Sequence, residues 1–401
     1  MSQPSHPLPP HRIFLTFLAL GLTSFGGPVA HIGYFREAFV VRRRWLDERA
    51  YADLVALCQM LPGPTSSQVG VGIGLTKAGY AGALAAWLGF TAPSAALMVG
   101  LGYGVVAYAD SIPPGLLAGL KAVVVAVVAQ AVWGMARTLC PDVPRVTIAA
   151  IAAAAALGIG GPAGQAGVIA GGAVAGFLFL RGSAAAPAGA RGAARPGVVP
   201  ALALALFFAA LVLLPVAAAS WPAQWLALAD SFYRSGALTF GGGHVVLPLL
   251  EAEVLPPGWV TRDAFLAGYG AAQALPGPLF TFAAYLGTVM EVPPSGWRGA
   301  AICLGAIFLP SFLLVAGTLP WWTALGRLEA TRRAMPGIEA AVVGLLLAAL
   351  YDPVWTAGVR SAGDFVLALA AFVALAAWKA PPWLVVLLGA AAGWGVASFA
   401  G

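Results

Sequence analysis

Two glycine-rich motifs combine residue types that could bind an anion inside an apolar segment. They read Ser-Phe-Gly-Gly-Pro from Ser24 to Pro28 and Thr-Phe-Gly-Gly-Gly from Thr239 to Gly243. Adjacent glycines weaken a helix and proline cannot donate the helical hydrogen bond, so each motif should interrupt its helix. Backbone N–H groups freed at a helix start bind anions, helped by the helix dipole. The first candidate substrate-binding residues are Ser24, Gly26, Gly27, Thr239, Gly241 and Gly242; close helix packing through small residues is the alternative role.

A second pair of motifs centres on Pro-Gly-Pro, with one copy between Gln59 and Gln68 and the other between Gln273 and Pro278. Pro-Gly-Pro ends one helix and lets another begin. Hydroxyl and amide donors around the new start would coordinate a dehydrated tetrahedral dianion. The second copy continues with leucine and phenylalanine, so the first half should be the better donor platform. The further candidates for substrate binding are Gln59, Pro62, Gly63, Thr65, Ser66, Ser67, Gln68, Gln273 and Gly277; a purely structural kink is the alternative.

Ionisable side chains in apolar segments are the candidates for coupling, because charge in a bilayer is costly and usually functional. Lys121 and Glu339 occupy equivalent positions of the repeat described below with opposite sign, so they could pair, or one could serve in coupling. His244 follows the second glycine motif and can carry a proton near neutral pH. Asp53 lies near the start of the second apolar segment. Interfacial snorkelling is the alternative role for such side chains.

The sequence carries no signature of an enzyme. It contains no phosphate-binding loop, Gly-x-Ser-x-Gly element, His-Glu-x-x-His helix or carboxylate cluster. Cys58, Cys140 and Cys303 are scattered and give neither a disulfide framework nor a metal cluster. We therefore expect no cofactor and no bound metal. An ATP-driven pump would need a soluble nucleotide domain, so an ion gradient, a substrate gradient or a partner protein must supply the energy.

The composition places these motifs in a membrane. The chain has 401 residues, of which 60% are apolar and only 9% charged, and its mean hydropathy is +0.88. So few charges cannot cover a water-facing surface. The net charge is +6, and the 21 lysine and arginine residues lie mostly between apolar stretches. In those places they orient a membrane protein rather than bind nucleic acid. The sequence predicts an all-α polytopic membrane protein with about 10–13 membrane segments, in which residues 50–76, 146–180 and 260–290 form broken helices or hairpins.

Four ordered matches divide the chain into two homologous halves. Residues 17–27, 45–64, 79–94 and 119–128 match residues 232–242, 259–278, 296–311 and 337–346. Low-complexity sequence could mimic one match but not the order of four. We therefore predict an N-terminal transporter repeat over 1–180, a linker plus an unpaired membrane segment over 181–223, and a C-terminal repeat over 224–401.

The charges flanking the second matched segment suggest that the repeats are inverted. The first copy is preceded by Arg36, Arg42, Arg43, Arg44 and Arg49, and its counterpart by Glu251, Glu253, Arg262 and Asp263. The positive-inside rule places the first of these loops in the cytoplasm and gives no such signal for the second. The remaining arginine clusters, at 181–195 and 327–333, do not fit one simple topology.

The combination of the two glycine motifs, the Pro-Gly-Pro motifs and the arginine-flanked segment from Trp45 to Gln68 resembles the chromate ion transporter family, in its long, two-domain form. The resemblance runs over nearly the whole chain. It implies a multi-pass protein of the bacterial inner membrane with homologous halves in opposite orientation, exporting chromate from the cytoplasm at the expense of the proton motive force. The implied partners are chromate, its structural analogue sulfate and protons. The lipid bilayer and a second copy in a homodimer are the further partners that we expect.

Two other functions remain compatible with the residues. The protein could import or exchange sulfate or another oxyanion, because the motifs do not set a direction. It could also be a membrane scaffold or assembly subunit that transports nothing.

Overall fold

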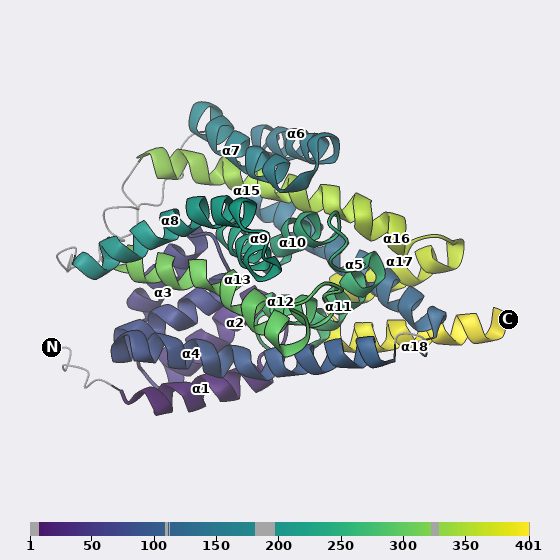
Figure 1. Ribbon diagram of the computed structural model, residues 1–401, viewed down its shortest axis with the longest axis horizontal. Helices are drawn as coiled ribbons and strands as arrows, with labels where there is room; N and C mark the ends of the chain where they lie inside the picture. Colours follow the sequence, from purple (N-terminus) through teal and green to yellow (C-terminus); the bar gives the residue numbers. More distant parts are fainter. Residues whose placement is uncertain (1–7, 109–110, 112, 181–196, 322–328, 401) are drawn as a thin grey trace.

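The computed structural model describes residues 8–108, 111, 113–180, 197–321 and 329–400, and these ranges are helical without a strand (Figure 1). The expected all-α class is therefore confirmed. Six of the described helices are long and apolar enough to cross a membrane, and the shorter apolar helices include Val143–Ile159 and Ala362–Ala376. Residues 181–196, which we expected to form the linker, lie outside the described residues. The two termini are at opposite ends of the long axis.

The first half begins with two short helices and continues into longer ones. Its elements are α1 (Pro10–Thr23), α2 (Gly27–Arg36), the π-helical turn η1 (Glu37–Arg42), α3 (Glu48–Met60), α4 (Thr65–Ala107), α5 (Pro114–Leu139), α6 (Val143–Ile159) and α7 (Gly161–Phe179). The backbone leaves the helical region at Ala78 and Gly79, so α4 consists of a first part, residues 65–77, and a second part, residues 80–107.

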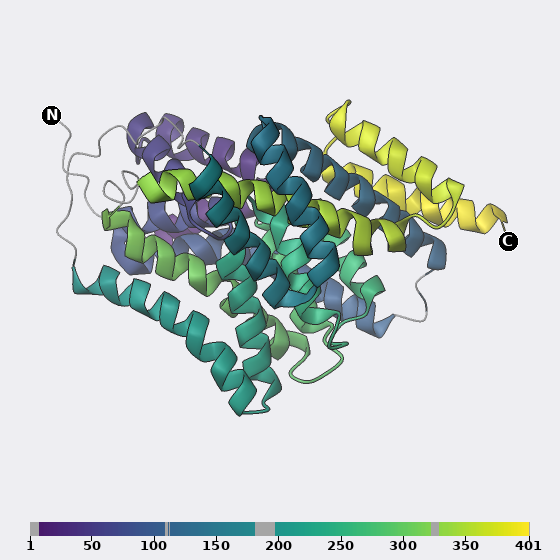
Figure 2. The same ribbon diagram turned by 90° about the horizontal axis from the view of Figure 1, so that it is seen from above.

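The second half repeats this order after α8 (Val198–Ser220), which runs along one edge of the molecule in Figure 2. Its elements are α9 (Gln224–Leu238), η3 (Gly243–Val245), α10 (Val246–Val254), α11 (Arg262–Ala274), η4 (Leu279–Thr281), α12 (Phe282–Thr288), α13 (Gly296–Thr318), η5 (Leu319–Trp321), α15 (Glu329–Ala349), η6 (Leu350–Trp355), α16 (Thr356–Gly358), α17 (Ala362–Ala376) and α18 (Pro382–Ala400). Gly287 packs on Gly299 as Gly74 packs on Gly82, so the first part of α4 corresponds to α12 and its second part to α13.

Each half folds its broken helices back as re-entrant hairpins. Phe17 of α1 stacks on Phe39 of η1 with ring centroids 4.9 Å apart, so α2 returns alongside α1. The Leu8 N–H donates to the Lys77 carbonyl at 3.1 Å, which brings the end of the second hairpin back beside the start of the first. In the second half the Glu291 N–H donates to the Trp259 carbonyl at 3.0 Å, so α12 likewise returns to the start of α11.

The equivalent helices of the two halves run antiparallel. The Trp297 N–H at the start of α13 donates to the Tyr103 hydroxyl near the end of α4 at 2.9 Å. At the other end, Tyr80 at the start of the second part of α4 lines one cavity with Ala316 near the end of α13. The second part of α4 and α13 therefore run in opposite directions, which confirms the inverted repeat.

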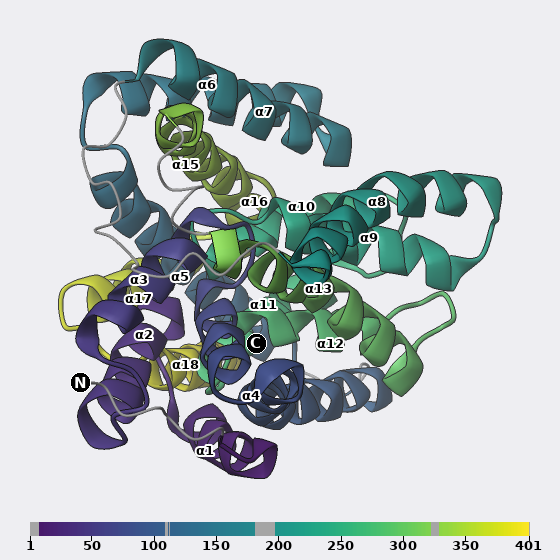
Figure 3. The same ribbon diagram turned by 90° about the vertical axis from the view of Figure 1, so that its left-hand side faces the viewer.

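The two halves also exchange their last helices. The pair α6–α7 packs on α15 of the second half, whereas the pair α17–α18 packs on α5 of the first (Figure 3). Small residues allow this approach: a Cβ at Gly119 would collide with the Gly389 carbonyl oxygen, and one at Gly337 with the Gly172 carbonyl oxygen. Helices of each predicted repeat thus pack on the other repeat. The boundaries predicted at 180/181 and 223/224 therefore stay a prediction about the sequence and do not separate two packing units.

The hydrophobic cores of the two halves differ in extent. The hairpins of the second half share one buried cluster with α5 and α17, which includes Phe232, Phe265, Tyr269 and Val125. The hairpins of the first half pack mainly among themselves, around Phe17 and Phe90, with Val315 of α13 as the buried contribution from the second half. One pair of hairpins is thus joined to the exchanged helices more extensively than the other.

Replacing Gly119 with alanine should destabilise the protein by about 1–3 kcal/mol, because the added methyl group meets the α18 backbone, which cannot yield without moving the helix. Gly134 lies on the same helix with no atom within 4 Å of an added Cβ and serves as the control. Thermal unfolding in detergent should show a lower midpoint for Gly119→Ala and an unchanged or higher one for Gly134→Ala. Equal midpoints would contradict the close α5–α18 approach.

Candidate functional site

The four interruptions in the hairpins form tips that contact one another across the two halves. We call residues 24–27, 61–64, 239–242 and 275–278 the four tips. The Gly63 N–H of the first half donates to the Thr239 carbonyl of the second at 2.6 Å. Reciprocally, the Gly277 N–H of the second half donates to the Ser24 carbonyl of the first at 3.0 Å. The predicted glycine and Pro-Gly-Pro motifs are therefore brought together by two repeat-related hydrogen bonds.

The tips require glycine because their backbone adopts left-handed conformations that other residues rarely accept. The tip residues with positive φ are Gly26 (+102°), Gly27 (+75°), Gly63 (+125°), Gly241 (+77°), Gly242 (+129°) and Gly277 (+95°). At Gly63 the space is closed as well, since a Cβ would lie 2.5 Å from the Ser311 hydroxyl oxygen and 2.6 Å from the Gln68 side-chain nitrogen. Gly26 and Gly241 are exposed, so the tips are not enclosed by protein on every side.

The first half supplies two α-helix starts at the tips, at Gly27 of α2 and at Thr65 of α4. Their unpaired N–H groups and dipoles favour a negative charge. Thr65, Ser66, Ser67 and Gln68 are all buried behind Pro64. The Gln68 side-chain N–H donates to the Pro62 carbonyl at 2.6 Å, which holds this amide against the tip.

His31 ties the two first-half tips together. Its Nε2 lies 3.1 Å from the Ser24 carbonyl oxygen and its Nδ1 lies 3.3 Å from the Ser66 hydroxyl. Because a carbonyl can only accept, Nε2 donates to Ser24. The ring is fully buried and therefore acts as a fixed spacer between the tips.

Several buried polar atoms on or beside the tips have no hydrogen-bond partner among the described residues. They are Ser24 Oγ, Ser67 Oγ, Gln68 Oε1, Thr91 Oγ1, Ser311 Oγ and Gln273 Nε2. Leaving such an atom unpaired costs about 1–3 kcal/mol. Five of the six can donate a hydrogen bond, and together with the positive ends of the two helix dipoles they suit an acceptor-rich ligand. Thr239 does not add to it, because its hydroxyl donates to the Ser235 carbonyl at 2.7 Å.

Three residues beside the tips were not predicted from the sequence. Ser311 of α13 lies against Gly63, and Ser94 in the second part of α4 lies against Gly277, so each contacts the Pro-Gly-Pro tip of the opposite half. Thr91 is one turn before Ser94, whose hydroxyl donates to the Thr91 carbonyl at 3.2 Å. The signal was present: both copies of the third repeated segment end in Pro-Ser.

The second half contributes fewer donors, as its sequence suggests. Its helices resume after the tips with the 3-10 turns η3 and η4 rather than with a regular α-helix. Phe280 and Phe282 replace the polar cluster of the first half and are buried in the core. Thr281 is buried too, but its hydroxyl donates to the Pro278 carbonyl at 2.9 Å. Gln59, by contrast, is exposed on α3, and its counterpart Gln273 is half-buried.

The coupling candidates do not gather at the tips. Lys121 forms an ion pair with Asp263 at 2.6 Å. The suggested pairing of Lys121 with Glu339 is wrong, because inversion puts the starts of α5 and α15 at opposite ends of the molecule. Glu339 instead has Arg145 of α6 nearby. His244 Nδ1 lies 3.0 Å from the Tyr269 hydroxyl, and Asp53 is half-buried on α3.

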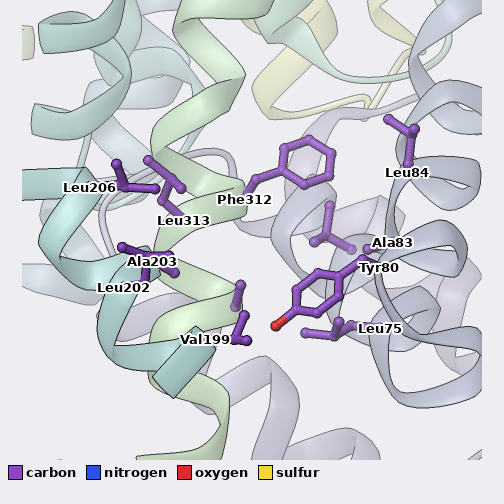
Figure 4. A pocket seen from close by; sticks show the side chains of 12 residues that line it. Leu75, Tyr80, Ala83, Leu84, Val199, Leu202, Ala203, Leu206, Phe312 and Leu313 are labelled. Carbon is purple, nitrogen blue, oxygen red and sulfur yellow. The ribbon is translucent and has the colours of Figure 1, made fainter. Parts of the chain in front are cut away.

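An apolar cavity of about 280 Å³ lies apart from the tips, between α4, α8 and α13 (Figure 4). Its lining includes Leu75, Leu202 and Phe312, and the Tyr80 hydroxyl is its main polar group. A cavity of this character does not suit an anion.

Two inverted halves whose broken helices meet beside buried polar side chains define a multi-pass membrane protein with the architecture of a transporter. The chain belongs to the chromate transporter family, whose model matches it twice, over residues 11–177 and 226–394.

Individual relatives match along nearly the whole chain. The chain is 31% identical to the chromate transport protein of Pseudomonas aeruginosa over 404 residues, covering 97% of this chain and 92% of that protein. It is 25% identical to the chromate transport protein of Cupriavidus metallidurans, covering 91% and 86% of the two chains. No solved structure matches the chain.

Replacing Gly63 with alanine should abolish substrate binding, because the methyl group would meet Ser311 and Gln68 and the left-handed backbone would be strained. Gly79 is the matched control: it also has a positive φ, of +62°, but no atom lies within 4 Å of its added Cβ. Oxyanion-dependent thermal stabilisation in detergent measures binding. We expect it to vanish in Gly63→Ala and persist in Gly79→Ala; loss in both or in neither would show that the tip contact is not the cause.

Proposed function

We propose that this protein is a secondary transporter that exports chromate from the bacterial cytoplasm across the inner membrane, driven by the proton motive force. The observation that carries this proposal is the cluster of unpartnered buried donors at the four tips. A tetrahedral dianion offers acceptor oxygens in every direction, which suits the unpartnered donors at the end of α1 and on α4 and α13. Membership of the chromate transporter family supports chromate as the ion.

The donors at the tips are neutral, which suits transport better than tight capture. The tip sequences contain no lysine or arginine. Hydroxyl, amide and backbone donors with two helix dipoles stabilise an anion without a permanent counter-charge that would retain it. Sulfate has the same shape and charge, so we expect it to compete with chromate. Sulfate import or exchange is the alternative that uses the same site.

The distribution of positive charge supports the orientation. Tracing the helices from the connection between α2 and α3 puts one set of basic residues at the same end of the molecule: Arg12, Arg36, Arg42, Arg43, Arg44, Arg49, Lys77, Arg137, Arg145, Arg332, Arg333 and Lys379. The opposite end has Lys121, Arg262, Arg298 and Arg360. By the positive-inside rule the first end is cytoplasmic.

The unequal packing of the hairpins supports alternating access. At the outer end α11 packs on α5 and α18, and the Lys121–Asp263 ion pair closes this contact. At the cytoplasmic end the equivalent helix α3 makes no comparable contact with α15 or α7 over the described residues. We infer from this difference in packing that the structure represents a state open to the cytoplasm. In the repeat, Glu339 is equivalent to Lys121 and Arg49 is equivalent to Asp263, so the second pair also has one positive and one negative charge. We infer that Arg49 and Glu339 approach each other when the cytoplasmic end closes.

Chromate flux into proteoliposomes of known sidedness tests the transport proposal. An imposed pH gradient should drive chromate accumulation through the wild-type protein, and sulfate should inhibit it.

Removing one donor with Ser67→Ala or Ser311→Ala should weaken chromate binding about threefold to tenfold, equivalent to about 1 kcal/mol.

The control for these variants is Ser220→Ala, since this serine is exposed at the end of α8. Flux of sulfate alone would establish the alternative substrate. Absence of both flux and oxyanion-dependent stabilisation in well-folded protein would favour a membrane scaffold.

The ion pair at the outer end provides a separate test of alternating access. Lys121→Glu should lower flux by about tenfold, because two carboxylates would then face each other at the α5–α11 contact. Adding Asp263→Lys should restore most of the flux by rebuilding the pair with reversed signs. Arg360→Glu, an exposed change at the same end, should have little effect. If the double variant is no better than Lys121→Glu, the pair does not close this end.

A further inference from the structure

A buried charged cluster joins the two arms of the third hairpin, the one formed by α9 and α10. The Arg234 guanidinium donates from Nε and Nη2 to the Asp230 carboxylate, at 3.0 and 2.8 Å. It also reaches the Glu253 carboxylate, with Nη1 at 3.0 Å from Oε1 and Nη2 at 3.1 Å from Oε2. Asp230 and Arg234 are on α9 and Glu253 is on α10, so this cluster bridges the arms.

The cluster carries one positive and two negative charges in a buried place. Asp230 is only 5% exposed and Glu253 only 8%, whereas the Arg234 side chain keeps a quarter of its surface exposed. One guanidinium cannot neutralise two carboxylates, and an uncompensated buried charge costs several kcal/mol. The cluster therefore gains from binding one cation, and the exposed part of Arg234 gives that cation access.

The neighbouring elements offer no other compensation. On the two arms the remaining polar neighbour is the Ser231 hydroxyl, which hydrogen-bonds to Glu253. Glu251 interacts with Arg262 and Asp352 instead. The packed helices α7 and α8 contain no charged residue. Arg298 of α13 is exposed over the Trp297 ring, and the charged residues of α15 lie between its start and its middle, toward the opposite end of the molecule.

We propose that Asp230, Arg234 and Glu253 form the proton-binding site that couples transport to the proton gradient. This inference rests on the proposed function. A proton is the cation that fits, because the guanidinium at the centre of the cluster would repel a metal ion. The proton converts one carboxylate to a neutral acid and brings the cluster to zero net charge. It belongs to the carboxylate pair as a unit rather than to one residue.

The position of the cluster explains how protonation would affect the substrate site at a distance, without contact between the proton and the substrate. The tip of this hairpin contains Thr239, whose carbonyl accepts the hydrogen bond from Gly63. Protonation weakens the bridge between α9 and α10, and the freedom gained by the arms is transmitted to that tip. In the first half the equivalent positions are Leu15, Ala19 and Ala38, and the hairpin is joined by the aromatic contact of Phe17 with Phe39 instead. The charged cluster is thus present in only one of these two equivalent hairpins.

Replacing Glu253 with glutamine, or Asp230 with asparagine, fixes the neutral form and separates coupling from translocation. The test compares two assays in proteoliposomes: chromate accumulation driven by an imposed pH gradient, and counterflow of labelled chromate against unlabelled chromate at equal pH. Each variant should lose about tenfold in gradient-driven accumulation while its counterflow stays within about twofold of wild type. The pH dependence of the remaining flux should flatten.

The matched control is Glu251→Gln, on the same short helix but outside the cluster, which should retain gradient-driven accumulation. Wild-type accumulation and pH dependence in both Glu253→Gln and Asp230→Asn would overturn the assignment. Loss of counterflow together with accumulation in both variants would also overturn it, since the cluster would then only support the fold. If the wild-type protein itself shows counterflow but no response to the pH gradient, the proposed proton coupling fails instead.

Discussion

Two backbone hydrogen bonds, from Gly63 to Thr239 and from Gly277 to Ser24, are the constraint on which the rest of this structure depends. Each connects a Pro-Gly-Pro tip of one half to a glycine-motif tip of the other. A broken helix leaves backbone N–H and carbonyl groups that lipid cannot hydrogen-bond. Here each half supplies a hydrogen-bond partner for one such group of the other half. The requirement explains why both copies keep their glycines while the surrounding side chains diverge. It also brings the parts of α4 and α13 that carry unpartnered hydroxyl and amide groups against the tips.

Inversion gives these shared tips two different surroundings. The second-half hairpins share a large core with α5 and α17, whereas the first-half hairpins form a more separate unit. Since both halves have the same design, the packing of one half is available to the other, and an exchange of the two arrangements is the conformational change that the proposed alternating access requires. The opposite signs at Lys121 and Glu339, and at Asp263 and Arg49, preserve attraction at both ends while distinguishing them.

The sequence predicted the fold class, the duplication, the inversion and the motifs that form the tips, because helix interruption and repeat spacing are local properties. It could not place most of the described basic residues at one end, since re-entrant hairpins return to the side on which they started and so change the count of crossings. Ser94 and Ser311 were missed for a related reason: their role depends on a contact between halves that no local pattern contains. The Lys121–Glu339 pairing failed because sequence equivalence in an inverted repeat does not mean proximity. Arg234 went unnoticed because it has no counterpart in the first half.

The exchange of the last helices has a consequence for synthesis. Helix α5 is inserted early, yet its packing partners α17 and α18 are the last to be made. Until they arrive, the small-residue face around Gly119 must be covered by lipid or by another protein in the membrane. The second half meets no such delay, because α6 and α7 are already in place when α15 emerges. Assembly of this protein therefore runs out of order with translation: the half that is made first is the half that is completed last.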